Sequence, residues 1–145
     1  MEAMTAKSRL DNTRLDNNSG DGAAAAKTRV LVVDDDLDSV RFMAVLLRAA
    51  GFDVATATSY ATAMQAAAGG EPPHVLITDI GLPDASGVDL LRELRRLYPV
   101  SGIALSGHAP EEVDGAGRSF DAYFQKPVDC EQVKREILRL MQRGS

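Results

Sequence analysis

The chain has 145 residues, of which 45% are hydrophobic and 26% are charged, so its length favours one domain with a sizeable buried core. An excess of 21 Asp and Glu over 16 Lys and Arg gives a net charge of −5, which disfavours nucleic acid and anionic membranes as partners. A single cysteine rules out an internal disulfide, and two histidines are too few for most transition-metal sites.

The first 28 residues differ in composition from the rest of the chain. They are mostly small or polar, with Leu10 and Leu15 among the few sizeable apolar side chains. Such a segment cannot bury enough surface to offset its ordering entropy, so we expect a disordered tail or linker. We expect the domain itself to span residues 29–142, followed by a short tail at 143–145. No signal peptide and no apolar run long enough for a membrane span is evident, so a cytoplasmic location is expected.

Three uninterrupted apolar runs, at residues 30–33, 75–77 and 103–105, follow in chain order. Runs without alternation are typical of strands that are buried on both faces of a parallel sheet. Residues 52–56 and 122–124 are weaker strand candidates.

A helical pattern follows the first strand and runs to residue 50, with Asp38 or Ser39 as its cap and Gly51 as its stop. The residues predicted to face inward are Val40, Met43, Ala44 and Leu47.

Three further helices are predicted. An alanine-rich one covers residues 60–68, one begins at Ser86 and is closed by Tyr98 before a proline, and the last runs from Asp129, its cap, to about residue 142. The inward residues of the last two are Leu90, Leu91, Leu94, Leu97, Val133, Ile137, Leu140 and Met141.

Strands and helices therefore alternate, which implies right-handed βαβ units and a doubly wound α/β domain with a parallel sheet. The stretch from residue 109 to 120 should hold a further helix between the last two strands. Because it contains Pro110, Gly115 and Gly117, that helix is expected to be short or irregular.

Polar side chains follow the predicted strands. Asp34, Asp35 and Asp36 come after the first strand, Asp79 after the third, Ser106 after the fourth and Lys126 after the fifth. Because parallel strands end at one edge of the sheet, these groups should meet there.

Adjacent carboxylates repel unless a cation lies among them, and oxygen ligands without His or Cys suit Mg²⁺. Asp79 stands alone at its strand end and could act as a nucleophile that forms an acyl phosphate. Taken singly, each residue also fits a plain structural role: Asp34 to Asp36 a turn or helix cap, Asp79 a solvated strand end, and Ser106 part of a turn.

Taken together, these residues resemble the receiver domain of two-component response regulators over residues 29–142. The motifs that carry the resemblance are Val32-Val33-Asp34-Asp35-Asp36, Ile77-Thr78-Asp79-Ile80-Gly81-Leu82-Pro83-Asp84, Ser86-Gly87, Leu105-Ser106-Gly107 and Lys126-Pro127. The resemblance implies a flavodoxin-like five-stranded sheet in the order 2-1-3-4-5.

The resemblance also implies the site. Asp79 would accept a phosphoryl group, and Mg²⁺, with Mn²⁺ as a substitute, would be held by Asp34, Asp35, Asp79 and the backbone carbonyl of Gly81. Lys126 would sense the phosphoryl group. Ser106 would be the switch hydroxyl and Tyr123 the aromatic residue that moves with it.

The implied donor is a phosphohistidine of a histidine kinase or a histidine phosphotransfer protein, and the switched chain would bind an unidentified protein target. The chain would assist its own phosphorylation and dephosphorylation without acting as an enzyme on a separate substrate. A monomer, or a weak dimer that depends on phosphorylation, is expected. Because the sequence ends after the last helix, a stand-alone receiver, a relay intermediate or the receiver of a hybrid sensor kinase is expected.

Alternatives remain open at this stage. The spacing Asp34-x-Asp36 fits a haloacid-dehalogenase-type phosphatase, although such enzymes usually need a cap domain. A receiver-like scaffold that is never phosphorylated is another reading, and a nucleotide-binding module is disfavoured because aspartates stand where phosphate-binding glycines are wanted. His74 and His108 are expected on loops or the surface without partners, and Cys130 as an ordinary, partly buried thiol.

Overall fold

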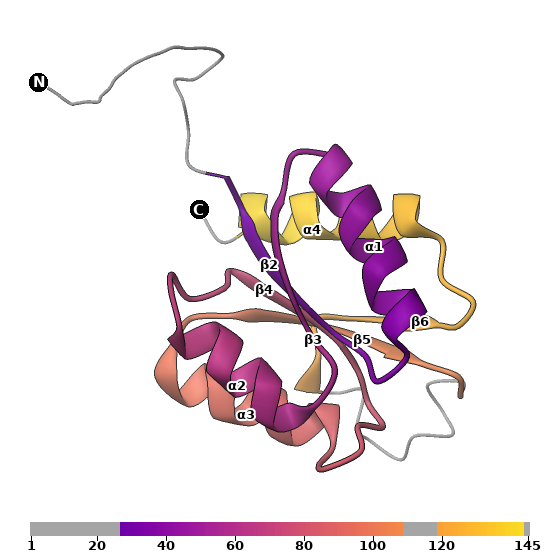
Figure 1. The fold of residues 1–145 in the computed structure, drawn as a ribbon. Coiled ribbons are helices and arrows are strands. Elements are labelled where there is room, and N and C mark those ends of the chain that lie inside the picture. The colour runs from indigo at the N-terminus through magenta and orange to yellow at the C-terminus, as the bar shows by residue number, and fades with distance from the viewer. Residues whose placement is uncertain (1–26, 109–118, 144–145) are drawn as a thin grey trace, which may run out of the picture.

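The computed structural model describes residues 27–108 and 119–143, which form a five-stranded parallel sheet between two layers of helices (Figure 1). The strands lie in the order β3-β2-β4-β5-β6, which is the expected order 2-1-3-4-5. Their bounds are β2 (Arg29–Val33), β3 (Asp53–Ala57), β4 (Val75–Asp79), β5 (Ser101–Ser106) and β6 (Ala122–Gln125). The predicted doubly wound fold is confirmed.

Four helices lie in the described part of the chain, two on each face of the sheet (Figure 1). α1 (Leu37–Ala49) and α4 (Cys130–Arg143) cover one face, and α2 (Tyr60–Ala68) and α3 (Gly87–Leu97) cover the other. An irregular helix is expected between β5 and β6 at residues 109–120, of which 109–118 lie outside the described residues. Residues 1–26 of the expected tail also lie outside them.

The centre of the sheet is buried on both faces, which explains why the runs in β2, β4 and β5 are apolar without alternation. In β2, Val30 and Val32 pack in the cluster beneath α1 and α4, while Leu31 and Val33 pack in the cluster beneath α2 and α3. All four are at most 1% exposed. Successive strand residues point to opposite faces, so a strand covered on both sides must be apolar throughout.

The inward face of α1 is the predicted one, but its cap is not. Val40, Met43, Ala44 and Leu47 are buried, and Gly51 ends the helix with a φ of +103°, a left-handed conformation that favours glycine. The cap is Asp36, whose carboxylate accepts hydrogen bonds from the Asp38 N–H at 3.1 Å and the Ser39 hydroxyl at 3.0 Å. The prediction of Asp38 or Ser39 was therefore wrong.

In α3 the prediction was wrong at one position. Leu90, Leu91 and Leu94 are buried, but Leu97 is 53% exposed. The stripe continues instead from Leu94 to Tyr98, four residues on, which is partly buried and packs against the same cluster. Within residues 27–108 and 119–143, no helix combines the length and hydropathy that crossing a membrane requires.

Candidate functional site

The carboxyl ends of β2 and β4 place Asp34 and Asp79 beside each other. The two strands pair in register, with Val33 opposite Thr78, so the residue after each belongs to the same edge of the sheet. β5 adds the next strand end, because Asp79 pairs with Leu105 and Ser106 follows. The strand ends that carry Asp34, Asp79 and Ser106 therefore lie at one edge of the sheet.

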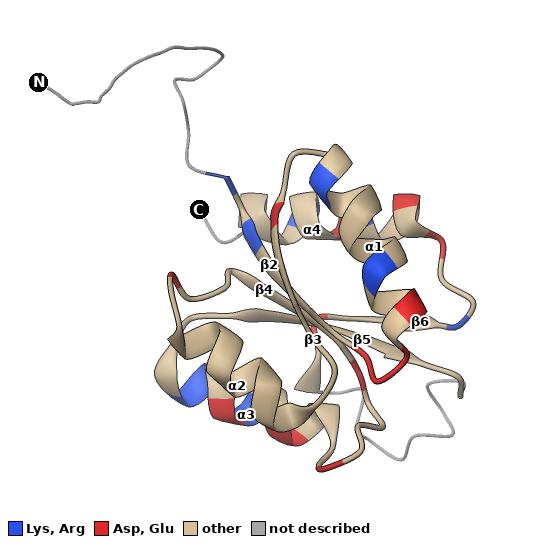
Figure 2. Ribbon diagram, in the orientation of Figure 1, with Lys and Arg blue, Asp and Glu red and all other residues tan. Residues whose placement is uncertain are grey.

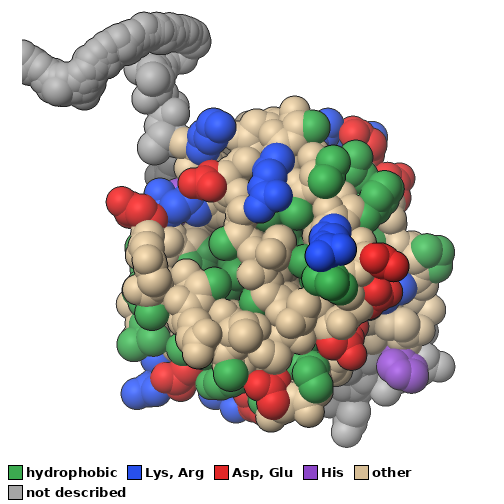
Figure 3. All heavy atoms as spheres, in the orientation of Figure 1, with side chains coloured by type: hydrophobic (Ala, Val, Ile, Leu, Met, Phe, Trp, Pro, Cys, Tyr) green, Lys and Arg blue, Asp and Glu red, His purple; other side chains and the backbone are tan. Residues whose placement is uncertain are grey.

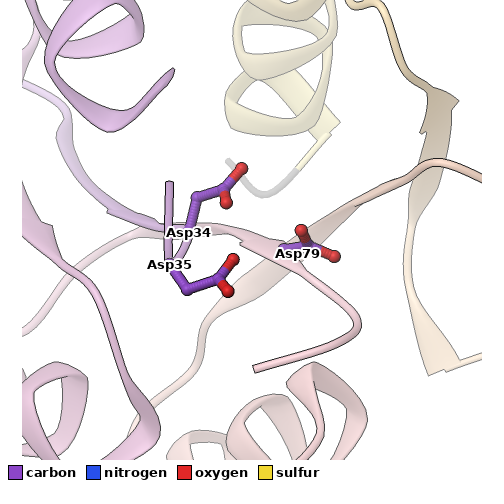
Figure 4. Close-up of side chains that lie close together, drawn as sticks. All are labelled: Asp34, Asp35 and Asp79. Atoms are coloured by element: carbon purple, nitrogen blue, oxygen red, sulfur yellow. The ribbon is translucent and has the colours of Figure 1, made fainter. Parts of the chain in front are cut away.

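Three carboxylates converge at this edge (Figure 4). Asp34, Asp35 and Asp79 each offer one oxygen, and these oxygens lie within 4.8 Å of one another. Asp34 is 2% exposed, whereas Asp35 is exposed and Asp79 is half-buried. The cluster is thus anchored on its inner side and open to solvent on its outer side. The turn from β2 into α1 that supplies two of the three is acidic throughout (Figure 2).

The third aspartate of the acidic run has a different role. Asp36 is exposed and its carboxylate caps α1, and its hydrogen bond to the Ser39 side chain holds its pKa below the usual value. The N–H of Asp36 donates to the Asp34 carboxylate at 3.0 Å. The run therefore divides into two residues that face Asp79 and one that starts the helix.

Lys126 joins two of the clustered carboxylates. Its Nζ donates to Asp34 Oδ2 and to Asp79 Oδ2, at 2.8 Å in each case. Burial alone would lower the pKa of this ammonium group, but the hydrogen bonds that it donates to Asp34 and Asp79 outweigh burial, and the pKa lies above its usual value. One ammonium among three carboxylates leaves a net negative charge, which suits a hard divalent cation with oxygen ligands.

The loop after Asp79 turns back towards α3. The Gly81 N–H donates to Asp79 Oδ1 at 3.0 Å, and the Gly87 N–H donates to the Ile80 carbonyl at 2.7 Å. Ser86 caps α3 through a hydrogen bond from the Asp89 N–H, as its predicted helix start requires. Gly81, the predicted carbonyl ligand, is exposed beside the carboxylate cluster.

Thr78 was not predicted as part of the site. It is fully buried, and its hydroxyl donates to the backbone carbonyl of Asp79 at 2.9 Å. A threonine between the apolar run at 75–77 and Asp79 is the sequence signal for it, because a buried hydroxyl needs a partner.

Ser106 is the last residue of β5, and Tyr123 is the second residue of the neighbouring strand β6. Ser106 is 4% exposed, and its hydroxyl oxygen accepts a hydrogen bond from the His108 N–H at 3.0 Å. Its backbone carbonyl accepts from the Lys126 N–H at 2.7 Å, which ties the lysine to the same edge. The Tyr123 hydroxyl donates to the His108 carbonyl at 2.9 Å.

His74 does have a partner, which corrects the expectation. It lies in the loop before β4, and its Nδ1 accepts a hydrogen bond from the Arg29 N–H at 2.9 Å. Burial, followed by the positive charge of Arg29, lowers the pKa of this histidine. No signal in the sequence links these two positions.

The fold and the acidic edge together define a doubly wound α/β protein whose site lies at the carboxyl ends of its strands, where such folds bind their ligands. The chain belongs to the response regulator receiver domain family, whose model matches residues 30–138. The resemblance stated from the motifs is thereby confirmed, and with it a place in two-component signalling.

Among curated relatives, the transcriptional regulatory protein KdpE of Mycobacterium tuberculosis is 34% identical over 120 residues, which cover 81% of this chain and 53% of KdpE. The chain thus spans about half the length of the curated relatives it matches. The expectation that no nucleic acid is bound is not supported, because these relatives are transcriptional regulatory proteins of which the chain spans only about half.

Solved structures agree with the fold. A CheY-like receiver domain from Methanospirillum hungatei has a TM-score of 0.74 and 27% identity, and the match covers 81% of this chain and 96% of that one. A response regulator from Burkholderia pseudomallei, solved with a phosphorylated aspartic acid and a calcium ion, has a TM-score of 0.66 and 26% identity over 74% of this chain and 64% of that one.

Proposed function

We propose that Asp79 is the phosphoacceptor of this receiver and that it takes the phosphoryl group from a phosphohistidine of a histidine kinase or phosphotransfer protein. The observation that carries the proposal is the position of the Lys126 ammonium, 2.8 Å from both Asp79 and Asp34, with Asp35 completing the cluster. A relative with the same fold carries a phosphorylated aspartic acid, which supports the assignment.

In the proposed step a carboxylate oxygen of Asp79 attacks the phosphorus atom. A P–O bond forms, the P–N bond to the imidazole breaks, and its electron pair stays on the imidazole nitrogen, which takes up a proton. Both oxygens of Asp79 are held beforehand, Oδ1 by the Gly81 N–H and Oδ2 by Lys126. Fixed orientation lowers the barrier because less freedom is lost when the partners meet.

Asp34, Asp35, Asp79 and the Gly81 carbonyl are the groups proposed to hold Mg²⁺ or Mn²⁺. Three carboxylate oxygens within 4.8 Å, open to water on the side of Asp35, fit an ion that keeps part of its hydration shell. When bound, the ion would supply positive charge for the oxygens of the transferred group.

The proposed switch follows from the charge that phosphorylation adds. A phosphoryl group brings about −1.5 to −2 charges and new acceptor oxygens. The Lys126 ammonium and the Ser106 hydroxyl are the donors at this edge, and Ser106 now accepts from the His108 N–H. If Ser106 turns towards the phosphoryl group, the ring of Tyr123 moves inward and its hydrogen bond to the His108 carbonyl changes.

The kinase-side partner is proposed to dock on α1. Hydrophobic side chains gather over the part of the surface that this helix covers (Figure 3), and there Phe42 and Val45 are 63% and 62% exposed. A cavity of about 470 Å³ reaches from Phe42 to Asp34 and Lys126. An apolar surface that continues into the site suits a protein that must bring its phosphohistidine to Asp79.

The phosphatase alternative is weaker. It needs both Asp34 and Asp36 at the reacting group, but Asp36 caps α1 and Asp34 is buried against Lys126. Turnover of a generic phosphate ester would revive it. A scaffold that is never phosphorylated remains the outcome if no phosphoryl group is taken up.

The receiver unit is proposed to span residues 29–142 and to work in the cytoplasm.

The proposal is tested by incubating the chain with acetyl phosphate and Mg²⁺ and measuring its intact mass. We expect one added phosphoryl group, lost in Asp79→Asn and after chelation of the metal. Asp36→Asn is the matched control, because it removes a neighbouring carboxylate that only caps a helix, and it should still be labelled. Labelling of the Asp79→Asn chain to the same extent would contradict the proposal.

A further inference from the structure

The loop that follows the proposed phosphoacceptor is tethered to a helix that precedes it in the chain. Asp84, an exposed residue five positions after Asp79, accepts hydrogen bonds from the first two N–H groups of α2. Its Oδ1 lies 2.8 Å from the Tyr60 nitrogen, and its Oδ2 lies 3.1 Å from the Ala61 nitrogen. The carboxylate therefore spans the start of α2, where unpaired N–H groups and the helix dipole favour a negative charge.

The electrostatic setting agrees with this geometry. The hydrogen bond from the Tyr60 N–H, and then that from the Ala61 N–H, lower the pKa of the Asp84 carboxyl group, so that its charged form is favoured. The contact links residues that are 24 and 23 positions apart.

α2 does not need Asp84 as its own cap. Ser59 fills that place, because its hydroxyl accepts from the Thr62 N–H and the Thr62 side chain in turn accepts from the Ser59 N–H, a complete capping box. Asp84 adds an acceptor from another part of the chain. Its contact consequently fixes the loop as much as it stabilises the helix.

The remaining hydrogen bonds of residues 81–86 are local, made within the segment or to the adjoining ends of β4 and α3. Gly81 donates to Asp79, Leu82 to Ala85, and Ser86 accepts from Asp89 at the start of α3. Among the described hydrogen bonds, those of Asp84 are thus the ones that join this segment to an element other than β4 and α3, which it connects. Ile80 and Leu82 pack against the core on the same side, so the loop has an apolar base and a polar tether at its tip.

We propose that Asp84 is a positioning residue for the metal site, because its bridge to α2 holds the loop that carries the Gly81 carbonyl. The inference rests on the proposed function, in which that carbonyl is a ligand. A ligand on a loop binds an ion well only where the loop is held in place, and partners outside the ligand set commonly change metal affinity by about 10- to 100-fold. Asp84 acts only through the backbone that it anchors.

The experiment compares Asp84→Ala with Ser59→Ala in the full chain. Both remove a partner of the α2 N-terminus, but only the first frees the loop. Mg²⁺ binding is measured by calorimetry and thermal stability by circular dichroism. We expect Asp84→Ala to weaken Mg²⁺ binding about tenfold, Ser59→Ala to leave it unchanged, and Asp84→Asn, which keeps one acceptor oxygen, to lie between. Equal affinities in Asp84→Ala and the unchanged chain, or equal losses in Asp84→Ala and Ser59→Ala, would overturn the inference.

A second readout separates positioning from general damage. With acetyl phosphate as donor, Asp84→Ala should need more Mg²⁺ for half-maximal phosphorylation but reach the same rate at saturation. A lower rate at saturating Mg²⁺ with an unchanged requirement would overturn the inference and leave the proposed function standing. Failure of the unchanged chain to bind Mg²⁺ would overturn both, so the two failures are distinguishable.

Discussion

At Gly87 the first turn of α3 lies against the end of β4, so close that a Cβ atom there would overlap the backbone carbonyl oxygen of Asp79. The same glycine donates its N–H to the Ile80 carbonyl at 2.7 Å. The atoms that a larger residue would meet are backbone atoms, which cannot turn aside as a flexible side chain could. This contact fixes the distance between the proposed phosphoacceptor and the helix that follows it.

Gly87→Ala is therefore predicted to destabilise the chain by about 1–3 kcal/mol, the usual cost of inserting a methyl group where there is no room. The free energy of unfolding in urea measures this. Gly70→Ala is the matched control, because a Cβ at Gly70 meets nothing within 4 Å. Equal stabilities of the two variants would show that α3 can move away from Asp79 at little cost.

Lys126→Met is predicted to lower the free energy of unfolding by about 2–3 kcal/mol in the presence of a chelator. This is below the range for breaking a fully buried pair because the lysine is 30% exposed. The chain loses stability because the Asp34 carboxylate, whose side chain is only 3% exposed, loses its positively charged partner. Excess Mg²⁺ should restore part of the stability, because the ion replaces the lost charge.

The matched control for this change is Lys134→Met. Lys134 pairs with Glu131 at 3.0 Å on the exposed side of α4, and surface pairs of this kind contribute less than about 1 kcal/mol. Similar losses in both variants, or no gain from Mg²⁺ in Lys126→Met, would show that the carboxylates do not depend on the lysine.

His74 predicts a pH dependence of stability. Because burial lowers its pKa in the folded state, below the value of about 6.5 expected when unfolded, the unfolded chain binds the proton more readily. The stabilisation is complete above about pH 6.5 and is lost as the pH falls through the folded-state pKa. Protonation of Nδ1 would also remove the acceptor for the Arg29 N–H.

We expect His74→Asn to have a smaller loss of unfolding free energy between pH 7 and pH 5 than the unchanged chain, since asparagine offers an acceptor oxygen and does not titrate. Urea unfolding at both pH values measures the difference. Identical pH profiles of the two chains would show that His74 does not contribute to acid sensitivity.

Cys130 is predicted to be a slow nucleophile, although it begins a helix. Burial, followed by the negative charges of Asp129 and Glu131, raises the pKa of its thiol, and its Sγ donates to Met43 Sδ at 3.7 Å. Alkylation by iodoacetamide should be slower than that of a free thiol and should rise at a higher pH. Glu131→Gln should move this rise in the alkylation rate towards lower pH. An alkylation rate that rises at a lower pH than that of a free thiol would contradict the prediction.

Apolar runs and their spacing predict the strands and most of the buried helix faces, whereas the strand order was implied by the resemblance to receiver domains. In α1 every residue predicted to face inward is buried. The cap of that helix was missed because five of residues 34–39 are Asp or Ser, which all can cap a helix, and the choice of Asp36 depends on where β2 ends. Leu97 was misplaced because its spacing fits the stripe, while the partly buried Tyr98 packs against the core in its place.

The site was predictable as far as it follows from strand ends. Asp34, Asp35, Asp79 and Lys126 come together because parallel strands share an edge. The contact of Asp84 with α2, and that of His74 with Arg29, depend on how loops fold over one another in space. No periodicity or spacing in the sequence records such contacts, so only the structure shows them.

The proposed function is tested most directly by locating the acyl phosphate on the chain. Borohydride reduces an aspartyl phosphate to homoserine, which peptide mass spectrometry can place at a single residue. After reaction with acetyl phosphate and Mg²⁺, we predict homoserine at position 79 and at none of positions 34, 35 and 36. Homoserine at position 34, or a chain that takes up no phosphoryl group, would contradict the assignment of Asp79 as the phosphoacceptor.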